Sequence, residues 1–313
     1  MDKKDLTRKV FGEALAAYGM QNRNVVVLVA DVSSSLMTGF FEQKLPERFF
    51  NVGIAEAGMV DTAVGFALGG KIPFVNTFAF LYTRAAEQIR TCVAYAGTNV
   101  KLVGGFAGLS NFKDGPTHHS TIDVALMRAM PNMVVLVPAD SVEARKMIPL
   151  AAEHQGPVYI RISREQMPVI FTDNHKVEIG KGVLVLEGND VTIIANGHML
   201  SRSMEAANIL GSRGIKARVI NMHTVKPVDS ALIQQCVRET GAIVTAEEHS
   251  IIGGLGSAVA DVVVKSCPAP VEMVGIADKF TETSTSFDSL LDRYGMSVAD
   301  IVGVAEHAIS RKH

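Results

Sequence analysis

Three short segments of this 313-residue sequence carry side chains that could take part in chemistry. In the first, Glu56 stands between Ala55 and Ala57 at the start of an apolar segment. A carboxylate in the first turn of a helix can simply complement the helix dipole. Because its neighbours are small, a flat ligand could also approach it closely. Glu56 is therefore either a helix-start acid or a ligand-binding acid.

The second segment, residues 77–90, places aromatic side chains directly after an apolar run. Phe78, Phe80 and Tyr82 follow that run, and Arg84 comes just behind them. At the carboxyl end of a parallel strand, such rings are well placed to stack on a planar ligand. Aromatic rings are also common in protein cores, so both interpretations stay open for Phe80.

The third segment is a glycine-rich loop, residues 104–120, which ends in two histidines and a serine. It contains Asp114 four residues before His118. Long loops between a strand and a helix often carry function. A turn between these two residues would bring an acid and an imidazole to the same opening.

The elements that position these segments alternate regularly along the chain. Continuous apolar runs indicate strands covered on both faces, which is typical of a parallel sheet between helices. The expected strands are residues 25–30, 72–76, 100–104, 133–137, 158–162, 191–195, 217–220, 242–246 and 271–274. The expected helices are residues 54–68, 84–96, 122–130, 141–154, 201–210, 230–238, 255–265, 287–294 and 298–309.

Residues 165–189 interrupt this alternation with a proline, several glycines and little periodicity, which indicates a linker with room for one hairpin. A chain of this length usually exceeds what one hydrophobic core supports. The sequence therefore predicts an α/β protein with two parallel-sheet domains, residues 1–166 and 190–313, joined by a linker at 167–189.

The three segments, in this order and spacing, resemble the pyrimidine-binding domain of transketolases. The resemblance continues at residues 7–9, 30–35 and 162–168 of the same half. Residues 225–229 and 245–256 are similar to the transketolase C-terminal domain. The resemblance covers essentially the whole chain and implies the C-terminal section of a split, two-subunit transketolase.

This resemblance implies thiamine diphosphate as the cofactor. Glu56 would hydrogen-bond N1′ of its pyrimidine and act as a catalytic acid/base that sets the tautomer of the ring. Phe78 would stack on the pyrimidine. Simple alignment gives Leu81 as a second stacking residue, whereas a one-residue shift would give Phe80 or Tyr82. The further cofactor contacts that the resemblance implies are Asp31 and Arg84.

The resemblance also implies a site for sugar phosphates. Arg8, Ser35 and Arg164 match positions that hold the phosphate, and the planar fork of arginine suits that task. Asp114 and His118 match residues that bind substrate hydroxyls near the reacting carbons, and His118 would share in catalysis.

One position departs from the family pattern. Transketolases usually have a histidine eight residues before the aspartate of the loop motif, and this sequence has Phe106 there. The change removes a hydrogen-bond donor and makes the acceptor pocket more apolar. It therefore predicts a specialised substrate, with Phe106 as a substrate-binding residue.

The sequence contains no Gly-Asp-Gly segment, which transketolases use with a downstream asparagine to hold Mg²⁺ and the diphosphate in a preceding domain. We therefore expect no metal ligand on this chain, an N-terminal transketolase subunit as partner, Mg²⁺ bound by that partner, and self-association in a heterotetramer. The acidic and imidazole side chains of Glu247, Glu248 and His249 are expected to have a structural role, since the domain they resemble carries no thiamine.

Other readings stay open. The two-domain layout also fits the beta subunit of a 2-oxo acid dehydrogenase, a relative of deoxyxylulose-phosphate synthase, or a non-catalytic regulatory subunit. The loop motif favours transketolase over the dehydrogenase, and the acid at Glu56 speaks against a scaffold.

Composition narrows the class of protein. The net charge of -2 gives no basic footprint for nucleic acid. No apolar run is long and uncharged enough to span a bilayer, and the charged start is unlike a secretory signal. Three widely separated cysteines predict a reducing, cytoplasmic setting.

Overall fold

The larger sheet of the computed structural model, which describes residues 3–312, has seven strands in the order β12-β6-β7-β5-β4-β2-β3. The strands are β2 (Val25–Val29), β3 (Phe49–Asn51), β4 (Ile72–Phe78), β5 (Lys101–Gly105), β6 (Val134–Leu136), β7 (Val158–Arg161) and β12 (Thr224–Lys226). Neighbouring strands run parallel, except that β12 is antiparallel to β6 at the edge. The predicted α/β class is confirmed.

Helices cover both faces of this sheet, and β2 shows why its sequence is continuously apolar. Val25, Val27 and Val29 belong to one cluster of buried side chains, with the helices α1 and α7. Val26 and Leu28 belong to another, with α4 and α6. The helical segments are α1 (Thr7–Gln21), α2 (Ser33–Leu36), α3 (Gly39–Lys44), η1 (Pro46–Arg48), α4 (Glu56–Leu68), η2 (Ala79–Ala85), α5 (Ala86–Gln88), η3 (Ile89–Tyr95), α6 (Asp123–Ala129) and α7 (Ser141–Glu153).

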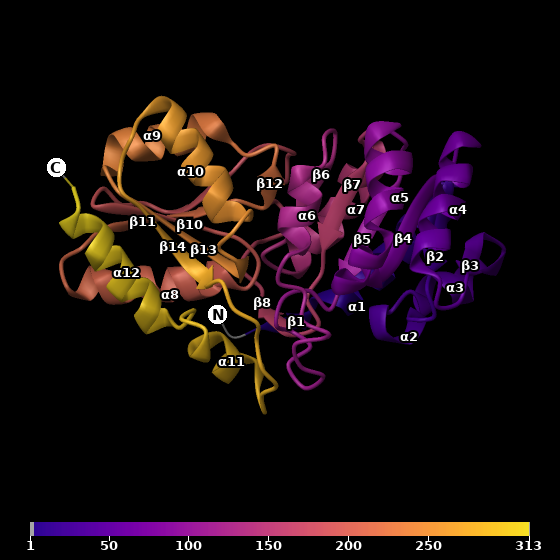
Figure 1. Ribbon diagram of the computed structural model, residues 1–313, viewed down its shortest axis with the longest axis horizontal. Coiled ribbons are helices and arrows are strands. Elements are labelled where there is room, and N and C mark those ends of the chain that lie inside the picture. Colours follow the sequence, from indigo (N-terminus) through magenta and orange to yellow (C-terminus); the bar gives the residue numbers. More distant parts are fainter. Residues whose placement is uncertain (1–2, 313) are drawn as a thin grey trace.

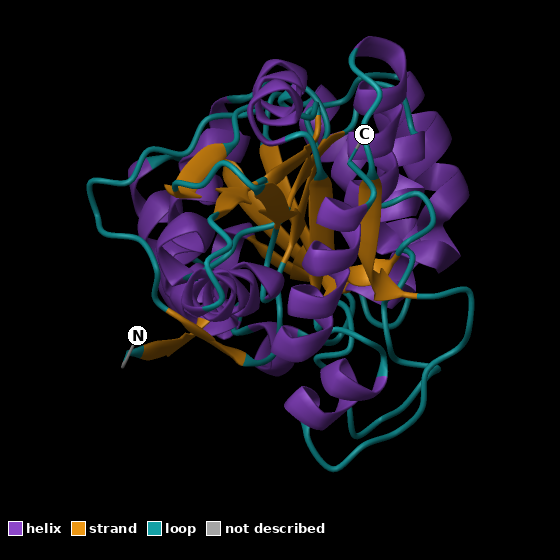
Figure 2. Ribbon diagram, turned by 90° about the vertical axis from the view of Figure 1, so that its left-hand side faces the viewer, coloured by secondary structure: helices purple, strands orange, loops and turns teal. Residues whose placement is uncertain are grey.

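The second sheet has five strands in the order β14-β13-β10-β11-β9. The strands are β9 (Val183–Leu186), β10 (Val191–Ala195), β11 (Ala217–Asn221), β13 (Ile243–Ser250) and β14 (Val271–Ile276). The helices are α8 (Met199–Ser212), α9 (Ser230–Thr240), α10 (Leu255–Ser266), α11 (Phe287–Arg293) and α12 (Val298–Ser310). Figure 1 shows α9 and α10 on one side of this sheet and α8 and α12 on the other, and Figure 2 shows the strands enclosed by helices.

The two halves are joined by more than the linker. Strand β12, from the second half, completes the first sheet beside β6, and Lys226 donates a hydrogen bond of 3.0 Å to the carbonyl of Arg128. Buried side chains of α4 and α6 belong to the same apolar cluster as those of α9 and α10. The halves therefore share a core, while the domain boundaries at residues 166 and 189 remain a prediction.

Two local expectations were wrong. Residues 84–96 do not form one α-helix: the chain runs from the 3₁₀ turns of η2 through α5 into the π-helical η3. The linker forms no hairpin within the described residues. Instead β8 (Gln166–Pro168) pairs with β1 (Lys4–Leu6) at the start of the chain, and β9 pairs with β11. Strands β8 and β9 each pair with a strand that is distant in the sequence, and a local sequence pattern does not predict such pairing.

Among residues 3–312, no helix combines the length and the apolar character that crossing a bilayer requires.

Candidate active site

The predicted site residues gather at one edge of the larger sheet because parallel strands all end on the same side. Asp31 follows β2 and the segment before Glu56 follows β3. Phe78 ends β4, Phe106 comes directly after β5, and Arg164 follows β7. Residues up to 133 positions apart in the chain, Asp31 and Arg164, thus meet at one edge.

Glu56 is the first residue of α4, and its side chain is buried, with 4% of the residue exposed. The helix N-terminus favours a carboxylate at this place. Oε2 lies 3.6 Å from a guanidinium nitrogen of Arg84, whose side chain is largely exposed. Oε1 is buried and has no hydrogen-bond partner among the described residues. Buried carboxyl oxygens normally have partners, so Oε1 is free to bond a ligand.

Some side chains of the aromatic segment, residues 78–82, lie at the edge of the larger sheet, and others lie in the core. Phe78 is half-buried, and its ring centroid lies 4.5 Å from that of Phe106. Phe80 is also half-buried, with its ring 5.0 Å from the imidazole of His118. Both rings therefore lie at the edge where the other predicted residues gather.

Tyr82 points away from that edge. Tyr82 is fully buried, and its hydroxyl donates to the carbonyls of Val75, at 2.7 Å, and Val103, at 3.2 Å. Burial raises the pKa of Tyr82 well above its ordinary value. Leu81 is largely buried as well. The structure does not bring Tyr82 to the site, and Phe80 is the ring of this segment that accompanies Phe78.

Phe106 lies under two arginines. Its ring centroid is 5.4 Å from the guanidinium carbon of Arg8 and 5.1 Å from that of Arg164, a geometry that favours cation–π contact. Arg8 donates a hydrogen bond of 2.5 Å to the carbonyl of Ser35. Burial and the charge of Arg164 lower the pKa of Arg8, and Glu165 opposes this. Two guanidinium groups over the same ring have the charge to bind an anion.

Asn111 holds the side chain of Arg164 in place, and the sequence did not predict this contact. Arg164 donates a hydrogen bond of 2.7 Å to Oδ1 of Asn111, which is fully buried in the loop after β5. Its position in the glycine-rich loop was the only signal in the sequence. The contact sets the direction of Arg164 toward Phe106.

The loop places Asp114 and His118 on consecutive turns. The backbone N–H of His118 donates to the carbonyl of Gly115, at 2.9 Å, and its ring lies 3.0 Å from the hydroxyl of Thr117. Asp114 is exposed. Both side chains are therefore accessible from outside the chain, while their meeting at one opening stays a prediction.

Asp31 has a left-handed backbone, with φ of 56°. Its N–H donates to Oδ1 of Asn51, at 3.1 Å, and the same oxygen accepts from the N–H of Gly53. Asn51 thus ties the end of β2 to the turn that leads into Glu56. This tie was not expected from the sequence.

Glu247, Glu248 and His249 join the second half to the first. Glu247 accepts hydrogen bonds from the N–H groups of Leu255 and Gly256 at the start of α10. Glu248 accepts one of 2.5 Å from the N–H of Leu109, in the loop after β5.

The ring of His249 accepts a hydrogen bond from the N–H of Ala125, in α6, at 3.3 Å. All three side chains are buried. These contacts support the expected structural role. Part of that role is the hydrogen bond of Glu248 to Leu109, in the loop after β5.

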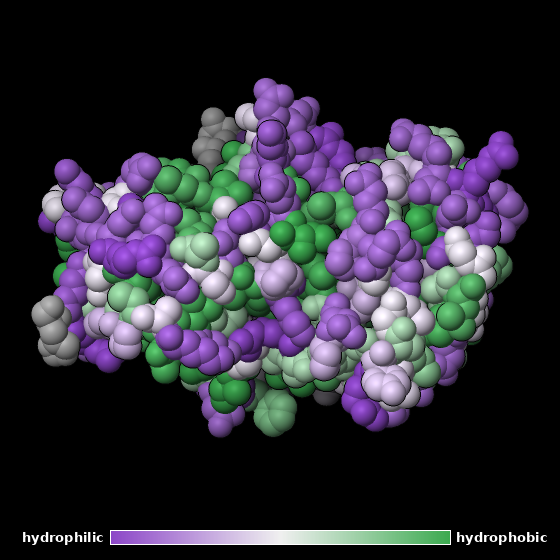
Figure 3. All heavy atoms as spheres, turned by 90° about the horizontal axis from the view of Figure 1, so that it is seen from above, coloured by the Kyte–Doolittle hydropathy of each residue, from purple (hydrophilic) through white to green (hydrophobic). Residues whose placement is uncertain are grey.

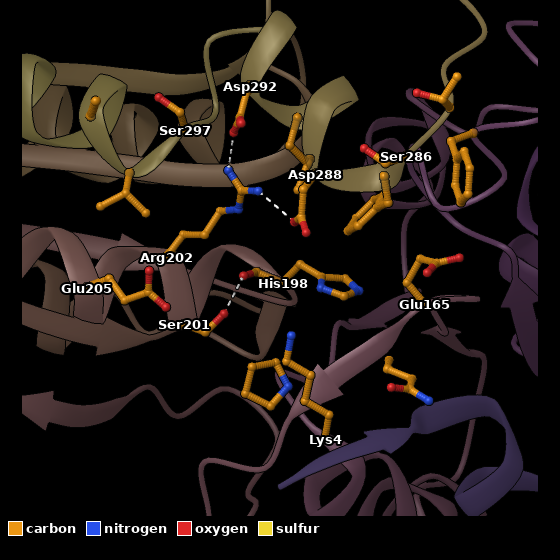
Figure 4. A pocket seen from close by; sticks show the side chains of 18 residues that line it. Lys4, Glu165, His198, Ser201, Arg202, Glu205, Ser286, Asp288, Asp292 and Ser297 are labelled. Atoms are coloured by element: carbon orange, nitrogen blue, oxygen red, sulfur yellow. Dashed lines mark hydrogen bonds and ion pairs between the residues drawn. The ribbon is translucent and has the colours of Figure 1, made fainter. Parts of the chain in front are cut away.

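A separate cavity of about 1000 Å³ lies between the second half and the β1–β8 pair. Figure 4 shows Arg202 between Asp288 and Asp292, with His198 and Lys4 facing the same space. None of the predicted site residues lines this cavity. Arg202 forms ion pairs with Asp288 and Asp292 in this cavity.

Family models match both halves of the chain. The model of the transketolase pyrimidine binding domain matches residues 3–169, and that of the transketolase C-terminal domain matches residues 180–301. The chain belongs to the transketolase family. Within this family it corresponds to the C-terminal section that split enzymes carry as a separate polypeptide, as two similar proteins and one solved structure show.

The 6-deoxy-6-sulfo-D-fructose transketolase subunit of Clostridium sp. (strain MSTE9) is 41% identical over 307 residues, 98% of this chain and 95% of that protein. A putative transketolase C-terminal section of Methanocaldococcus jannaschii is 42% identical, covering 92% of each chain.

A solved split gene transketolase, described as an inactive beta4 tetramer, superposes with a TM-score of 0.90 at 44% identity, covering 98% of this chain and 99% of that one. A transketolase of Campylobacter jejuni shares the fold, with a TM-score of 0.82 at 23% identity over 96% of this chain and 46% of its own.

The contact of Glu248 with the loop makes stability depend on pH. Burial raises the pKa of Glu248 from 4.5 to about 7, although Arg161 and the Leu109 N–H oppose this. The folded protein therefore binds more protons than the unfolded chain between these values, and its stability falls as the pH rises through them. We expect Glu248→Gln, whose amide oxygen can still accept from Leu109, to remove this dependence.

The effect corresponds to about 3 kcal/mol between pH 4 and pH 8. Urea unfolding of both proteins at several pH values measures it as the difference between wild type and variant. If the two curves run parallel, Glu248 does not titrate in the folded state in this range.

Proposed function

We propose that this transketolase-family chain is the pyrimidine-binding subunit of a thiamine diphosphate-dependent transketolase. A separate N-terminal subunit would hold Mg²⁺ and the diphosphate. Together they would transfer a two-carbon ketol unit from a ketose phosphate to an aldose phosphate. The observation that carries this proposal is Glu56, a buried acid with one unpartnered oxygen at the sheet edge.

The residues present fit the thiamine pyrimidine. Oε1 of Glu56 lacks a partner among the described residues, as a group that bonds a ring nitrogen would. The ring of Phe78 is half-buried at the same sheet edge and can stack on a planar ligand. Arg84, 3.6 Å from Oε2, holds the carboxyl group in place. Bound thiamine diphosphate would supply the electron sink for cleaving the bond beside a ketose carbonyl.

The chain's own part in the reaction would be to bind, orient and move protons. Glu56 would share a proton with N1′ of the pyrimidine. Arg8 and Arg164 would hold the terminal phosphate, because both guanidinium groups lie over the same ring, that of Phe106. Asp114 and His118 would bond the substrate hydroxyls from the loop.

The surface beside Glu56 supports a partner subunit. Ile54, two residues before it, is 74% exposed, and Ala55 and Gly58 are exposed as well. An acid that is buried next to an open apolar surface suits a site completed by another chain. Figure 3 shows apolar side chains among polar ones on the face seen from above. The unpaired cysteines fit the expected cytoplasmic setting.

The alternative functions, a dehydrogenase beta subunit and a non-catalytic subunit, differ from a transketolase in what the candidate site would bind. A dehydrogenase beta subunit would pass its product to a lipoyl protein, and a lipoyl acceptor assay separates the two. A non-catalytic subunit would have no use for an unpartnered buried acid. The Arg8–Phe106–Arg164 group favours an anionic sugar as substrate.

The first prediction concerns partnership. Alone, this chain should bind thiamine diphosphate weakly and turn over no ketose, because the Mg²⁺ ligands would lie on the other subunit. The partner can be identified by co-purification. Calorimetric titration of the cofactor with Mg²⁺, into this chain alone and into the complex, measures the difference. Tight, Mg²⁺-dependent binding with turnover by the lone chain would refute the proposal.

The second concerns Glu56. In the reconstituted complex, Glu56→Gln should slow proton exchange at C2 of the cofactor by about 10²–10⁴-fold, the usual contribution of a positioned acid/base. Deuterium exchange followed by NMR measures this step directly. The exposed Glu13 on α1, changed to Gln, is the matched control and should exchange at the wild-type rate. An unchanged rate in Glu56→Gln removes that residue from its role.

The third concerns Phe106. Replacing it with histidine restores a hydrogen-bond donor and removes the apolar ring, so pentose phosphates should become better substrates by about tenfold. Phe106→Leu keeps the apolar character but removes the aromatic face under both arginines. It should therefore weaken the anionic substrate without favouring pentose phosphates.

Values of kcat/KM for ribose 5-phosphate and xylulose 5-phosphate, compared across wild type and both variants, decide the matter. If wild type already uses both sugars as well as Phe106→His does, Phe106 does not determine specificity.

A further inference from the structure

The loop that carries the candidate substrate residues is held in place by the second half of the chain. Four hydrogen bonds cross from one to the other: Leu109 N–H to Glu248 Oε1 (2.5 Å), Ser284 N–H to Phe112 O (3.0 Å), Ser250 N–H to Thr121 O (2.8 Å), and His119 Nδ1 with Thr281 Oγ1 (2.7 Å). Only the last of these four joins two side chains. A substitution at either of its two residues therefore removes it without changing the backbone.

His118 and His119 are neighbours in opposite surroundings. His118 is half-exposed beside Phe80, whereas His119 is buried under the segment that contains Thr281. Since the two residues share a peptide unit, fixing the ring of His119 also fixes the backbone from which His118 projects.

The chemistry of this contact suits a hydroxyl in particular. Burial lowers the pKa of His119 and so favours the neutral ring at pH 7, in which Nδ1 either donates or accepts according to the tautomer. A hydroxyl can do either, and a methyl group can do neither. Thr281 is itself buried, and Thr283, two residues on, packs against Gly115 of the same loop.

We infer that Thr281 is a positioning residue for substrate binding, acting through His119 on the loop that carries Asp114 and His118. The expected effect on KM rests on the proposed function, whereas the expected effect on the loop does not. The inference assigns the second half of the chain a direct share in substrate affinity, although none of its residues need touch the substrate. Cofactor binding at Glu56, on a different element, should not depend on this contact.

Two measurements on Thr281→Val test the inference. In the full chain without ligands, hydrogen–deuterium exchange of residues 106–121 should become about 2- to 10-fold faster, the range for losing one neutral hydrogen bond. In the reconstituted complex, KM for the ketose and the aldose should rise by a similar factor. The kcat value and the affinity for thiamine diphosphate should stay close to those of wild type.

Thr281→Ser keeps the hydroxyl and should restore wild-type exchange and KM. Thr285→Val makes the same change at an exposed position of the same segment and should change neither. Exchange at the wild-type rate in Thr281→Val, or failure of Thr281→Ser to restore it, overturns the positioning role. Faster exchange with an unchanged KM overturns the link to substrate. Because exchange needs no turnover, a failure of the proposed transketolase activity would be seen separately.

Discussion

The relation between the two halves of this chain depends on one buried cation, Arg161. Its guanidinium donates to Asp123 Oδ2 at 2.8 Å, to the carbonyl of Ser120 at 3.2 Å and to the carbonyl of Glu248 at 2.9 Å. Burial alone would raise the pKa of Asp123, but the positive charge of Arg161 and its hydrogen bond lower it. A buried ion pair is tolerated only when its remaining hydrogen bonds are satisfied, and here the second half supplies one of them.

That cation stands at the end of β7, where the first sheet, the loop and β13 meet. The loop is therefore set by contacts from a part of the chain more than 120 residues away. The second half, from which no cofactor contact is expected, thus has a structural role at the candidate site. The second half contacts the loop through Glu248, whereas Glu56 and Phe78 lie on other elements of the first half.

The candidate site itself is built around groups that are left incomplete. One oxygen of Glu56 is buried without a partner among the described residues, and two arginines converge on one phenyl ring. Each feature costs stability by itself, because an unpartnered polar group and repelling charges are unfavourable. Both costs are offset where a ligand supplies a hydrogen bond and a pair of negative charges, which is why such groups mark functional sites.

The sequence by itself determined the fold class, the family and the order of the site segments, because apolar runs and short motifs are local properties of the chain. It also placed Glu56 in the first turn of a helix, and Phe78 and Phe106 at or just after the ends of strands. Only the tertiary structure decided which aromatic ring reaches the edge. Phe80 and Tyr82 differ by two positions, but the turns of η2 send one to the surface and the other into the core.

The sequence did not predict the contacts between residues that lie far apart along the chain. Strand β12 pairs with the first sheet, Asn111 directs Arg164, and Thr281 holds His119 across 162 positions. Such pairs follow from packing two sheets against each other, and no local spacing encodes them. The sequence therefore identified the family and the candidate site residues, whereas the fold decided which distant residues hold them in place.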